Sequence, residues 1–240
     1  MMFIARGDAK KLRLDCALPP AVRPHTPFGS ISLSQDASRD APPATKEPRT
    51  GTFYPGDFCL RADQSPCPVL IGTGVRSRKL AGFKNLDIYS LGLYVDVPRL
   101  KATAEGQELP LSQMFDVLIH GSDLERTLRI VITSRLVTQS RFLHALEENL
   151  APVMEQAGDS TSLPAFAAQF ESKGFHRGTE VAFTTSGTQL DTYIDGVKAG
   201  TIASPTLVKG LFEMYLGQDP VAPDAKRAFA QGLAKAMEPE

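Results

Sequence analysis

The alternation of apolar and polar residues is clearest in Leu70–Val97, and it predicts a β-hairpin there. The second half, Leu86–Val97, is rich in β-branched and aromatic residues, which is typical of a strand. With a period of two, one face of this strand carries Tyr89, Leu91, Leu93 and Val95. In the first half, Gly72 and Gly74 are expected to allow a sharp bend just before Arg76.

The expected hairpin places an arginine opposite a tyrosine. If the chain reverses at Gly82–Phe83, Arg76 lies directly across from Tyr89, with Cβ atoms roughly 5 Å apart. A guanidinium and a phenol that both face an apolar interior are costly unless they are bonded to something. A carboxylate between them would satisfy both groups, so Arg76 and Tyr89 are the candidate ligand-binding pair. Considered singly, each is also compatible with an ordinary role, Arg76 as a solvated surface residue and Tyr89 as a core residue.

Beyond the hairpin, the pattern predicts further strands and then helices. Strands are expected over residues 115–120, 126–133, 180–185, 189–195 and 197–202, and helices over 139–157, 163–173, 205–217 and 223–237. Residues 98–110 are predicted to form a polar loop. Thr138 and Ser140 are candidate N-caps of the first helix, and Pro152 is expected to kink it or to end its regular part. The apolar stripe of that helix is predicted to hold Phe142, Leu146, Asn149 and Val153.

The order of these elements is that of an α+β protein, in which an antiparallel sheet is covered by helices on one face. The length of 240 residues suits one domain at 51–240 after an N-terminal segment at 1–50. That segment carries seven prolines, no sustained periodicity and a local charge of +3, whereas residues 51–240 sum to −4. It is predicted to be disordered, either as an organellar transit peptide or as a plain disordered tail.

Composition excludes several function classes. The net charge of −1 indicates no attraction to nucleic acid or to an anionic membrane, and no apolar run reaches the ~20 residues of a membrane span. The three cysteines and four histidines have no metal-ligand spacing, so neither a metal site nor a cofactor is expected. Cys59 and Cys67 are predicted to be free thiols, with a disulfide between them as the alternative. Local motifs for a nucleophile, a phosphate loop or a dinucleotide are absent.

The sequence G-x-G-x-R at residues 72–76, followed by Y-S-x-G-x-Y at residues 89–94, resembles the core motif of the chalcone-isomerase-like family. The resemblance extends from Cys59 to the C-terminus and is most specific between Gly72 and Tyr94. It is similar in particular to the non-catalytic, fatty-acid-binding members of plant plastids. The resemblance implies an open-faced β-sandwich, in which a ligand cleft separates a large antiparallel sheet from a helical layer. It also implies a plastid (chloroplast stroma) location.

The resemblance further implies roles for particular residues. The catalytic arginine and the helix asparagine of true chalcone isomerases fall on Arg76 and Asn149, which are retained. Three hydroxyl-bearing positions depart from the pattern, because they hold Tyr89, Phe142 and Val208. Phe142 and Val208 cannot donate a hydrogen bond, and Tyr89 fills space that a flavonoid ring needs.

These departures suit a protein that binds free fatty acids of medium or long chain without catalysis. Arg76 and Tyr89 would hold the carboxylate, and Phe142, Asn149 and Val208 would line the cleft. Without the resemblance, Phe142 and Val208 are equally compatible with ordinary core positions, and Asn149 with a buried amide bonded to the backbone. Chalcone isomerase activity and a non-catalytic regulator of the flavonoid pathway are the alternative functions.

Overall fold

The structure is a computed structural model that describes residues 43–61, 64, 66–79, 85–104, 109–171 and 173–238. Its main element is a six-stranded antiparallel sheet in which the strands neighbour one another in chain order. The strands are β3 (Val69–Lys79), β4 (Asn85–Val95), β5 (Arg126–Ile132), β6 (Glu180–Ser186), β7 (Gln189–Ile194) and β8 (Val197–Ala203). A small separate sheet pairs β1 (Thr45–Lys46) with β2 (Phe53–Tyr54).

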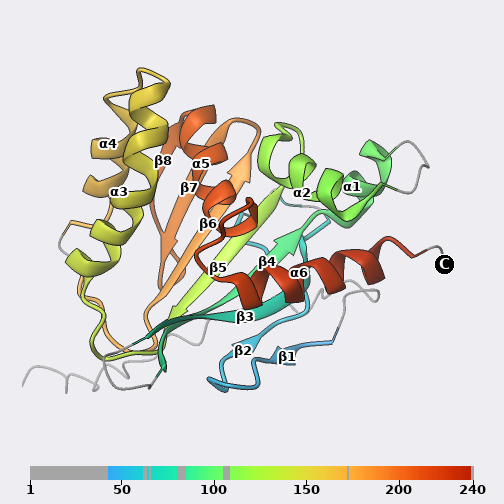
Figure 1. The fold of residues 1–240 in the computed structure, drawn as a ribbon, viewed down its shortest axis with the longest axis horizontal. Helices are drawn as coiled ribbons and strands as arrows, with labels where there is room; N and C mark the ends of the chain where they lie inside the picture. Colours follow the sequence, from blue (N-terminus) through green and yellow to red (C-terminus); the bar gives the residue numbers. More distant parts are fainter. Residues whose placement is uncertain are drawn as a thin grey trace, which may run out of the picture. The chain divides into compact units, whose positions relative to one another are not determined.

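Six helices in the described residues cover one face of the large sheet, as Figure 1 shows. They are α1 (Val97–Thr103), α2 (Leu111–His120), α3 (Gln139–Gln156), α4 (Ser162–Ala168), α5 (Pro205–Leu216) and α6 (Pro223–Ala236). α5 packs between α3 and α2, and α6 lies along β3 (Figure 1). The sheet stays open and does not close into a barrel. The α+β class and the open-faced sandwich expected from the sequence are confirmed.

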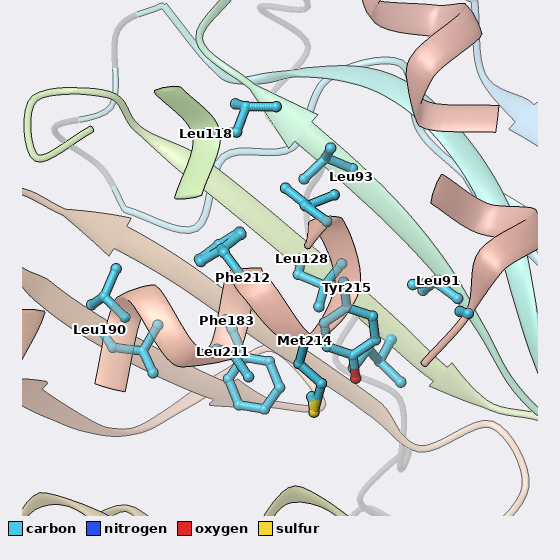
Figure 2. Close-up of a cluster of buried hydrophobic side chains, with 14 of the residues drawn as sticks. Leu91, Leu93, Leu118, Leu128, Phe183, Leu190, Leu211, Phe212, Met214 and Tyr215 are labelled. Carbon is cyan, nitrogen blue, oxygen red and sulfur yellow. The ribbon is translucent and has the colours of Figure 1, made fainter. Parts of the chain in front are cut away.

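The core lies between the sheet and α5. Residues of three neighbouring strands, Leu91, Leu93, Leu128 and Phe183, face the helix residues Leu211, Phe212, Met214 and Tyr215 (Figure 2). Each such side chain contributes about 1.5–3 kcal/mol when it is fully buried. The predicted core face of β4 is confirmed, since all four of its residues belong to this cluster.

The register of the hairpin is confirmed where it bears on the site. Arg76 pairs with Tyr89, and the same register continues through the pair Gly72 and Leu93. Register shifts interrupt the pairing between Leu70 and Gly72 and again after Arg76. The predicted turn at residues 82–83 lies outside the described residues.

The bend predicted at Gly72 and Gly74 is wrong, because both glycines lie within β3. Their role is to let α6 approach the strand. A Cβ atom at Gly74 would lie 2.5 Å from the Cα of Ala225, and one on Gly232 of α6 would lie 1.7 Å from the carbonyl oxygen of Ile71. Contacts under 3.0 Å essentially never occur for real Cβ atoms, so glycine is needed on both sides of this interface.

The buried stripe of α3 differs from the predicted one. Phe142, Leu146, Leu150 and Met154 face the core, at successive intervals of four residues. Asn149 and Val153 lie outside this stripe. The helix also continues through Pro152 to Gln156, so the expected end of its regular part is wrong. Thr138 is its N-cap, as expected, because its side chain accepts a hydrogen bond from the Arg141 N–H.

Three further predictions of secondary structure were wrong. Residues 115–120 belong to α2 rather than to a strand, because Met114, Phe115, Leu118 and Ile119 form a buried helical face. The predicted loop at 98–110 begins with α1, whose N-cap Asp96 accepts a hydrogen bond from the Arg99 N–H. The predicted helix at 163–173 ends at Ala168. The other strands and helices were predicted within a few residues of their ends.

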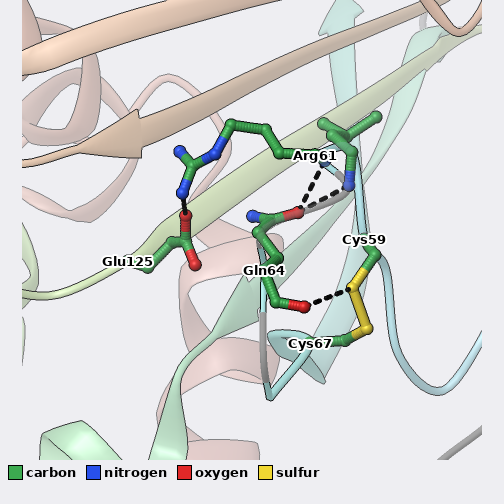
Figure 3. The surroundings of a disulfide bond; sticks show 6 residues. Cys59, Arg61, Gln64, Cys67 and Glu125 are labelled. Atoms are coloured by element: carbon green, nitrogen blue, oxygen red, sulfur yellow. Dashed lines mark hydrogen bonds and ion pairs between the residues drawn. A yellow bond between two sulfur atoms is a disulfide. The ribbon is translucent and has the colours of Figure 1, made fainter.

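Cys59 and Cys67 form a disulfide, so the prediction of free thiols was wrong for this pair (Figure 3). The loop that the bond closes is also held by Gln64, whose Oε1 accepts hydrogen bonds from the backbone N–H groups of Leu60 and Arg61. Arg61 forms an ion pair with Glu125, at 2.5 Å (Figure 3). The bridge therefore fixes the chain immediately before β3. The spacing of the cysteines alone did not decide whether the two thiols pair.

The predicted N-terminal segment lies outside the described residues up to residue 42, whereas Thr45–Lys46 forms β1 and pairs with β2. Among the helices that the structure describes, none has the length and apolar character that crossing a membrane requires. Within the same residues, no group of three or more histidine, cysteine, aspartate or glutamate side chains is arranged to hold a metal ion.

Candidate functional site

The site is a pocket of about 460 Å³ at the end of the sheet where β3 finishes and β4 begins. Three segments form its walls. The strands β3 and β4 contribute Arg76, Ser77, Arg78, Leu86, Ile88 and Tyr89. The helix α3 and the loop before it contribute Leu136, Val137, Arg141, Phe142, Ala145, Leu146 and Glu148. The loop before α6 contributes Val221. We call this the Arg76 pocket. Its volume lies within the ~300–1,000 Å³ that is usual for small-molecule sites.

Three polar side chains form a connected row along one wall. The Arg76 Nη1 donates a hydrogen bond to the Tyr89 hydroxyl at 3.2 Å. The Tyr89 hydroxyl in turn lies 2.8 Å from the hydroxyl of Tyr215. Because Arg76 and Tyr89 come from paired strands and Tyr215 comes from α5, the row joins the sheet to the helical layer.

The charge on Arg76 has no acidic partner within the described residues, since no carboxylate lies within 4.0 Å of its nitrogens. Burial by itself disfavours the charged guanidinium. The neighbouring Tyr89 and Tyr215 hydroxyls and the carboxylate of Glu148 outweigh this, so the pKa of Arg76 is raised above its ordinary value. Arg76 is therefore a cation that is half-buried and hydrogen-bonded to the Tyr89 hydroxyl.

Tyr215, the innermost group of the row, stays a neutral phenol. Burial, together with the neighbouring Tyr89, raises the pKa of Tyr215 well above its ordinary value of 10.0. Tyr215 is 1% exposed and Tyr89 is 2% exposed, so water reaches neither hydroxyl freely. The wall thus offers O–H and N–H donors around a fixed positive charge, which is the arrangement that binds an anionic oxygen group.

The remaining wall is mostly apolar. Phe142 packs its ring edge-on against Tyr89, with centroids 6.2 Å apart, and Phe170 and Phe175 lie behind it. Aliphatic side chains complete the surface: Leu86, Ile88, Leu136, Val137, Leu146 and Val221. The described lining holds no histidine, cysteine or lysine, and its one serine, Ser77, already donates a hydrogen bond to Asp87.

Of the five residues singled out from the sequence, the structure brings three together. Arg76, Tyr89 and Phe142 line the Arg76 pocket. Asn149 is exposed, and its side-chain amide donates a hydrogen bond to the backbone oxygen of Ala145 one turn earlier. Val208 is buried beside a different hollow of about 250 Å³, which forms between the end of α2 and the start of α5.

Sequence reasoning missed Tyr215. The residue lies near the end of α5, a helix of 12 residues in which eight are buried. A tyrosine in such a helix must direct its hydroxyl toward a partner, and this was a usable signal. The partner itself was not predictable, because Tyr89 lies 126 residues earlier in the chain.

The chain is similar to one known protein family and to named relatives. A family model described as "Chalcone isomerase-like" matches residues 68–229. The chain is 24% identical over 221 residues to fatty-acid-binding protein 1 of Arabidopsis thaliana, a match that covers 87% of this chain and 75% of that protein.

Two further matches are a second relative from the same plant and a solved structure with the same fold. The chain is 28% identical over 193 residues to fatty-acid-binding protein 2 of Arabidopsis thaliana; this covers 75% of this chain but only 48% of that relative. The crystal structure of an Arabidopsis thaliana fatty-acid-binding protein, AtFAP1, superposes with a TM-score of 0.69 at 24% identity. That match covers 81% of this chain and 98% of the other.

Proposed function

This chain belongs to the chalcone isomerase-like family, and from that premise we propose that it binds free fatty acids without catalysing a reaction. In the proposed complex the carboxylate accepts hydrogen bonds from Arg76 and Tyr89, and the acyl chain lies in the Arg76 pocket. The ligand class is a fatty acid of medium or long chain, and binding supports plastid fatty-acid metabolism.

The observation that carries the proposal is the state of Arg76. Its guanidinium is half-buried, has no carboxylate within 4.0 Å among the described residues, and is bonded to a phenol. A ligand carboxylate supplies the missing charge and can accept two parallel N–H bonds. Such charge-assisted bonds are roughly twice as strong as neutral ones.

The apolar wall suits the rest of the ligand. Each methylene group that leaves water contributes ~0.8 kcal/mol, so the acyl chain supplies most of the affinity and the polar row sets the orientation. The names of the two Arabidopsis relatives support the same ligand class.

The direct test is to identify what the protein carries. The purified full chain is denatured and extracted, and the extract is analysed by mass spectrometry for free fatty acids. Laurate is then titrated into delipidated protein and the heat of binding is recorded. Co-purified acid and saturable binding are expected. An extract free of lipid, combined with no heat and no thermal shift on adding laurate, would refute the proposal.

Chalcone isomerase activity is the second candidate, because Arg76 stands where the family has its catalytic arginine. Incubation with naringenin chalcone separates the two, since the spontaneous reaction gives a racemic product. A racemate at the uncatalysed rate is expected, and an enantiomerically enriched product would favour the enzyme. Recovery of flavonoid-pathway enzymes in a pull-down would favour the third hypothesis, a non-catalytic regulator of that pathway.

The proposal includes the plastid (chloroplast stroma) as the place of action. The support is the composition of residues 1–50, with seven prolines and eight basic residues against five acidic ones. A fusion of these residues to a fluorescent protein is expected to enter isolated chloroplasts and to become resistant to added protease. A fusion that stays outside the organelle would restrict the proposal to fatty-acid binding alone.

A further inference from the structure

The opening of the Arg76 pocket carries a concentration of unpaired positive charge. Arg76, Arg78 and Arg141 line the pocket, and Arg135 precedes the lining residue Leu136. In the part of the chain that the structure describes, none of these four arginines has a carboxylate within 4.0 Å. Arg78, Arg135 and Arg141 are also exposed to solvent.

Acidic groups compensate this charge only in part. Glu148 lines the pocket and acts on Arg76 from beyond 4.0 Å, and its carboxylate lies 3.2 Å from the imidazole of His144. Asp87, near the same end of the sheet, is already paired with Arg49. The net charge of −1 predicted no attraction to an anionic membrane, but net charge is a property of the whole chain, and the positive rim is a local feature of the fold.

The rim also exposes an aliphatic side chain. Leu136 is 55% exposed and lines the pocket. Its backbone oxygen accepts a hydrogen bond from the Arg141 Nη1 at 2.8 Å, which fixes this loop against α3. An exposed leucine among arginines is suited to the boundary between lipid headgroups and acyl chains, where basic residues meet phosphates and apolar ones enter the hydrocarbon.

We infer that this rim, formed by Arg78, Arg135, Leu136 and Arg141, docks on the surface of a membrane that contains anionic lipids. The inference rests on the proposed function, because docking there would place the pocket opening where free fatty acids reside. A bilayer fits the rim better than an acidic protein does, since it offers negative headgroups and hydrocarbon together. Each basic residue near the membrane surface adds to the attraction, and the exposed Leu136 adds an apolar contact beside the three exposed arginines.

Vesicle sedimentation with the full chain tests the inference. The probes are phosphatidylcholine vesicles and vesicles in which about a third of the lipid is phosphatidylglycerol. Binding is expected only to the anionic vesicles and is expected to be lost in about 0.5 M NaCl, where surface charges are screened. Absence of binding to the anionic vesicles at low salt would overturn the inference.

A pair of matched variants decides whether the rim is responsible. Arg78→Glu with Arg135→Glu reverses two rim charges, and Arg99→Glu with Lys235→Glu makes the same net change on α1 and at the end of α6. Both control positions are exposed and lie toward the opposite end of the sheet, as Figure 1 shows for the two helices. The rim pair should weaken vesicle binding about tenfold or more, and the control pair less than about twofold. Equal losses would overturn the assignment to the rim.

The apolar contribution has its own variant. Leu136→Ser is expected to weaken vesicle binding severalfold at low salt while leaving its salt dependence unchanged. Because the basic segment at 1–50 is the same in every variant, it cannot account for differences among them.

Laurate titration without vesicles keeps the two proposals distinguishable. A chain that binds anionic vesicles but neither carries co-purified lipid nor binds laurate would refute the proposed function and leave docking in place. A chain that binds laurate but no vesicles would overturn the docking inference and leave the proposed function in place. A chain that binds an acidic protein instead of the vesicles would have the other class of partner, and this result would also overturn the docking inference.

Discussion

The hydroxyl of Tyr89 on β4 lies 2.8 Å from the hydroxyl of Tyr215 on α5. This contact connects Arg76 at the pocket wall to the buried interface between sheet and helices, since Arg76 donates to the same Tyr89 oxygen. Arg76 and Tyr89 are therefore not an isolated cross-strand pair. Tyr215 holds the phenol that the proposed carboxylate would meet.

Tyr215→Phe tests this link. The change removes one hydroxyl from a buried position without changing the ring, so the fold is expected to persist. Laurate affinity should fall by about 1 kcal/mol, roughly fivefold, because Tyr89 loses the partner that orients it. Titration calorimetry measures the effect. Tyr94→Phe is the matched control, since this tyrosine is buried and contacts Phe58 outside the pocket; an equal loss there would remove Tyr215 from the site.

Arg76→Ala should have the larger effect. Truncating the cation leaves the ligand carboxylate without its charged partner, a change that typically costs ~2 kcal/mol or more. Laurate affinity is therefore expected to fall about thirtyfold in the same titration. Arg99→Ala, on α1, removes an exposed arginine that does not line the pocket and should bind laurate like the unchanged protein. Unchanged affinity of the Arg76 variant would exclude Arg76 from the site.

Gly232→Ala tests the close approach of α6 to β3. Alanine is the better helix former by about 1 kcal/mol, so an exposed helix would be stabilised by this change. Here the new Cβ would lie 1.7 Å from the Ile71 carbonyl oxygen, and the helix must move away. We expect a net loss of about 1–3 kcal/mol in the free energy of unfolding, measured with urea. Gly174→Ala, where the added Cβ meets nothing within 4 Å, is the control and should change stability little.

Reduction of the Cys59–Cys67 bridge should destabilise the protein. The bond closes a short loop, with a sequence separation of 8, and the chain-entropy argument gives roughly 2–3 kcal/mol for a loop of this size. Dithiothreitol should therefore lower the midpoint of urea unfolding. The double variant Cys59→Ser with Cys67→Ser should show the lower midpoint with or without the reductant. A reductant effect that persists in this variant would point away from the bridge.

The carboxylate of Asp159 makes a pH-dependent contribution to the stability of the fold. Its oxygens accept hydrogen bonds from the Ser162 N–H and the Ser204 hydroxyl, at the starts of α4 and α5. The hydrogen bonds from Ser162, which have the largest effect, and the one from Ser204 hold the pKa of this carboxyl well below its ordinary value of 3.8. A depressed acid pKa stabilises the fold above the ordinary value, and this contribution is lost as the pH falls below it.

Asp159→Asn should therefore lower the midpoint of thermal unfolding at neutral pH. The difference in midpoint between the variant and the unchanged protein should become smaller below about pH 4. Thermal unfolding followed by circular dichroism at several pH values measures both. A gap that stays constant with pH would mean that the charge on Asp159 contributes nothing.

The sequence by itself determined the local features. A period of two fixed which face of β4 is buried, and it gave the pairing of Arg76 with Tyr89, because register in a hairpin depends on residues close together in the chain. Thr138 caps α3 as its position predicted, since the side chain of a cap accepts a hydrogen bond from an N–H only three residues ahead. The α+β class also followed from the order of the predicted strands and helices.

Only the tertiary structure decided the features that depend on distant partners. Gly72 and Gly74 were expected to bend the chain, but packing against α6, some 150 residues later, is what requires them. The buried face of α3 includes Leu150 rather than Asn149, because the neighbouring α5 selects the face. Tyr215 reaches Tyr89, and Arg76 and Arg78 of β3 line the same pocket as Arg141 of α3, because separate elements pack together. Local patterns record what each segment favours, whereas these contacts depend on how the segments pack together.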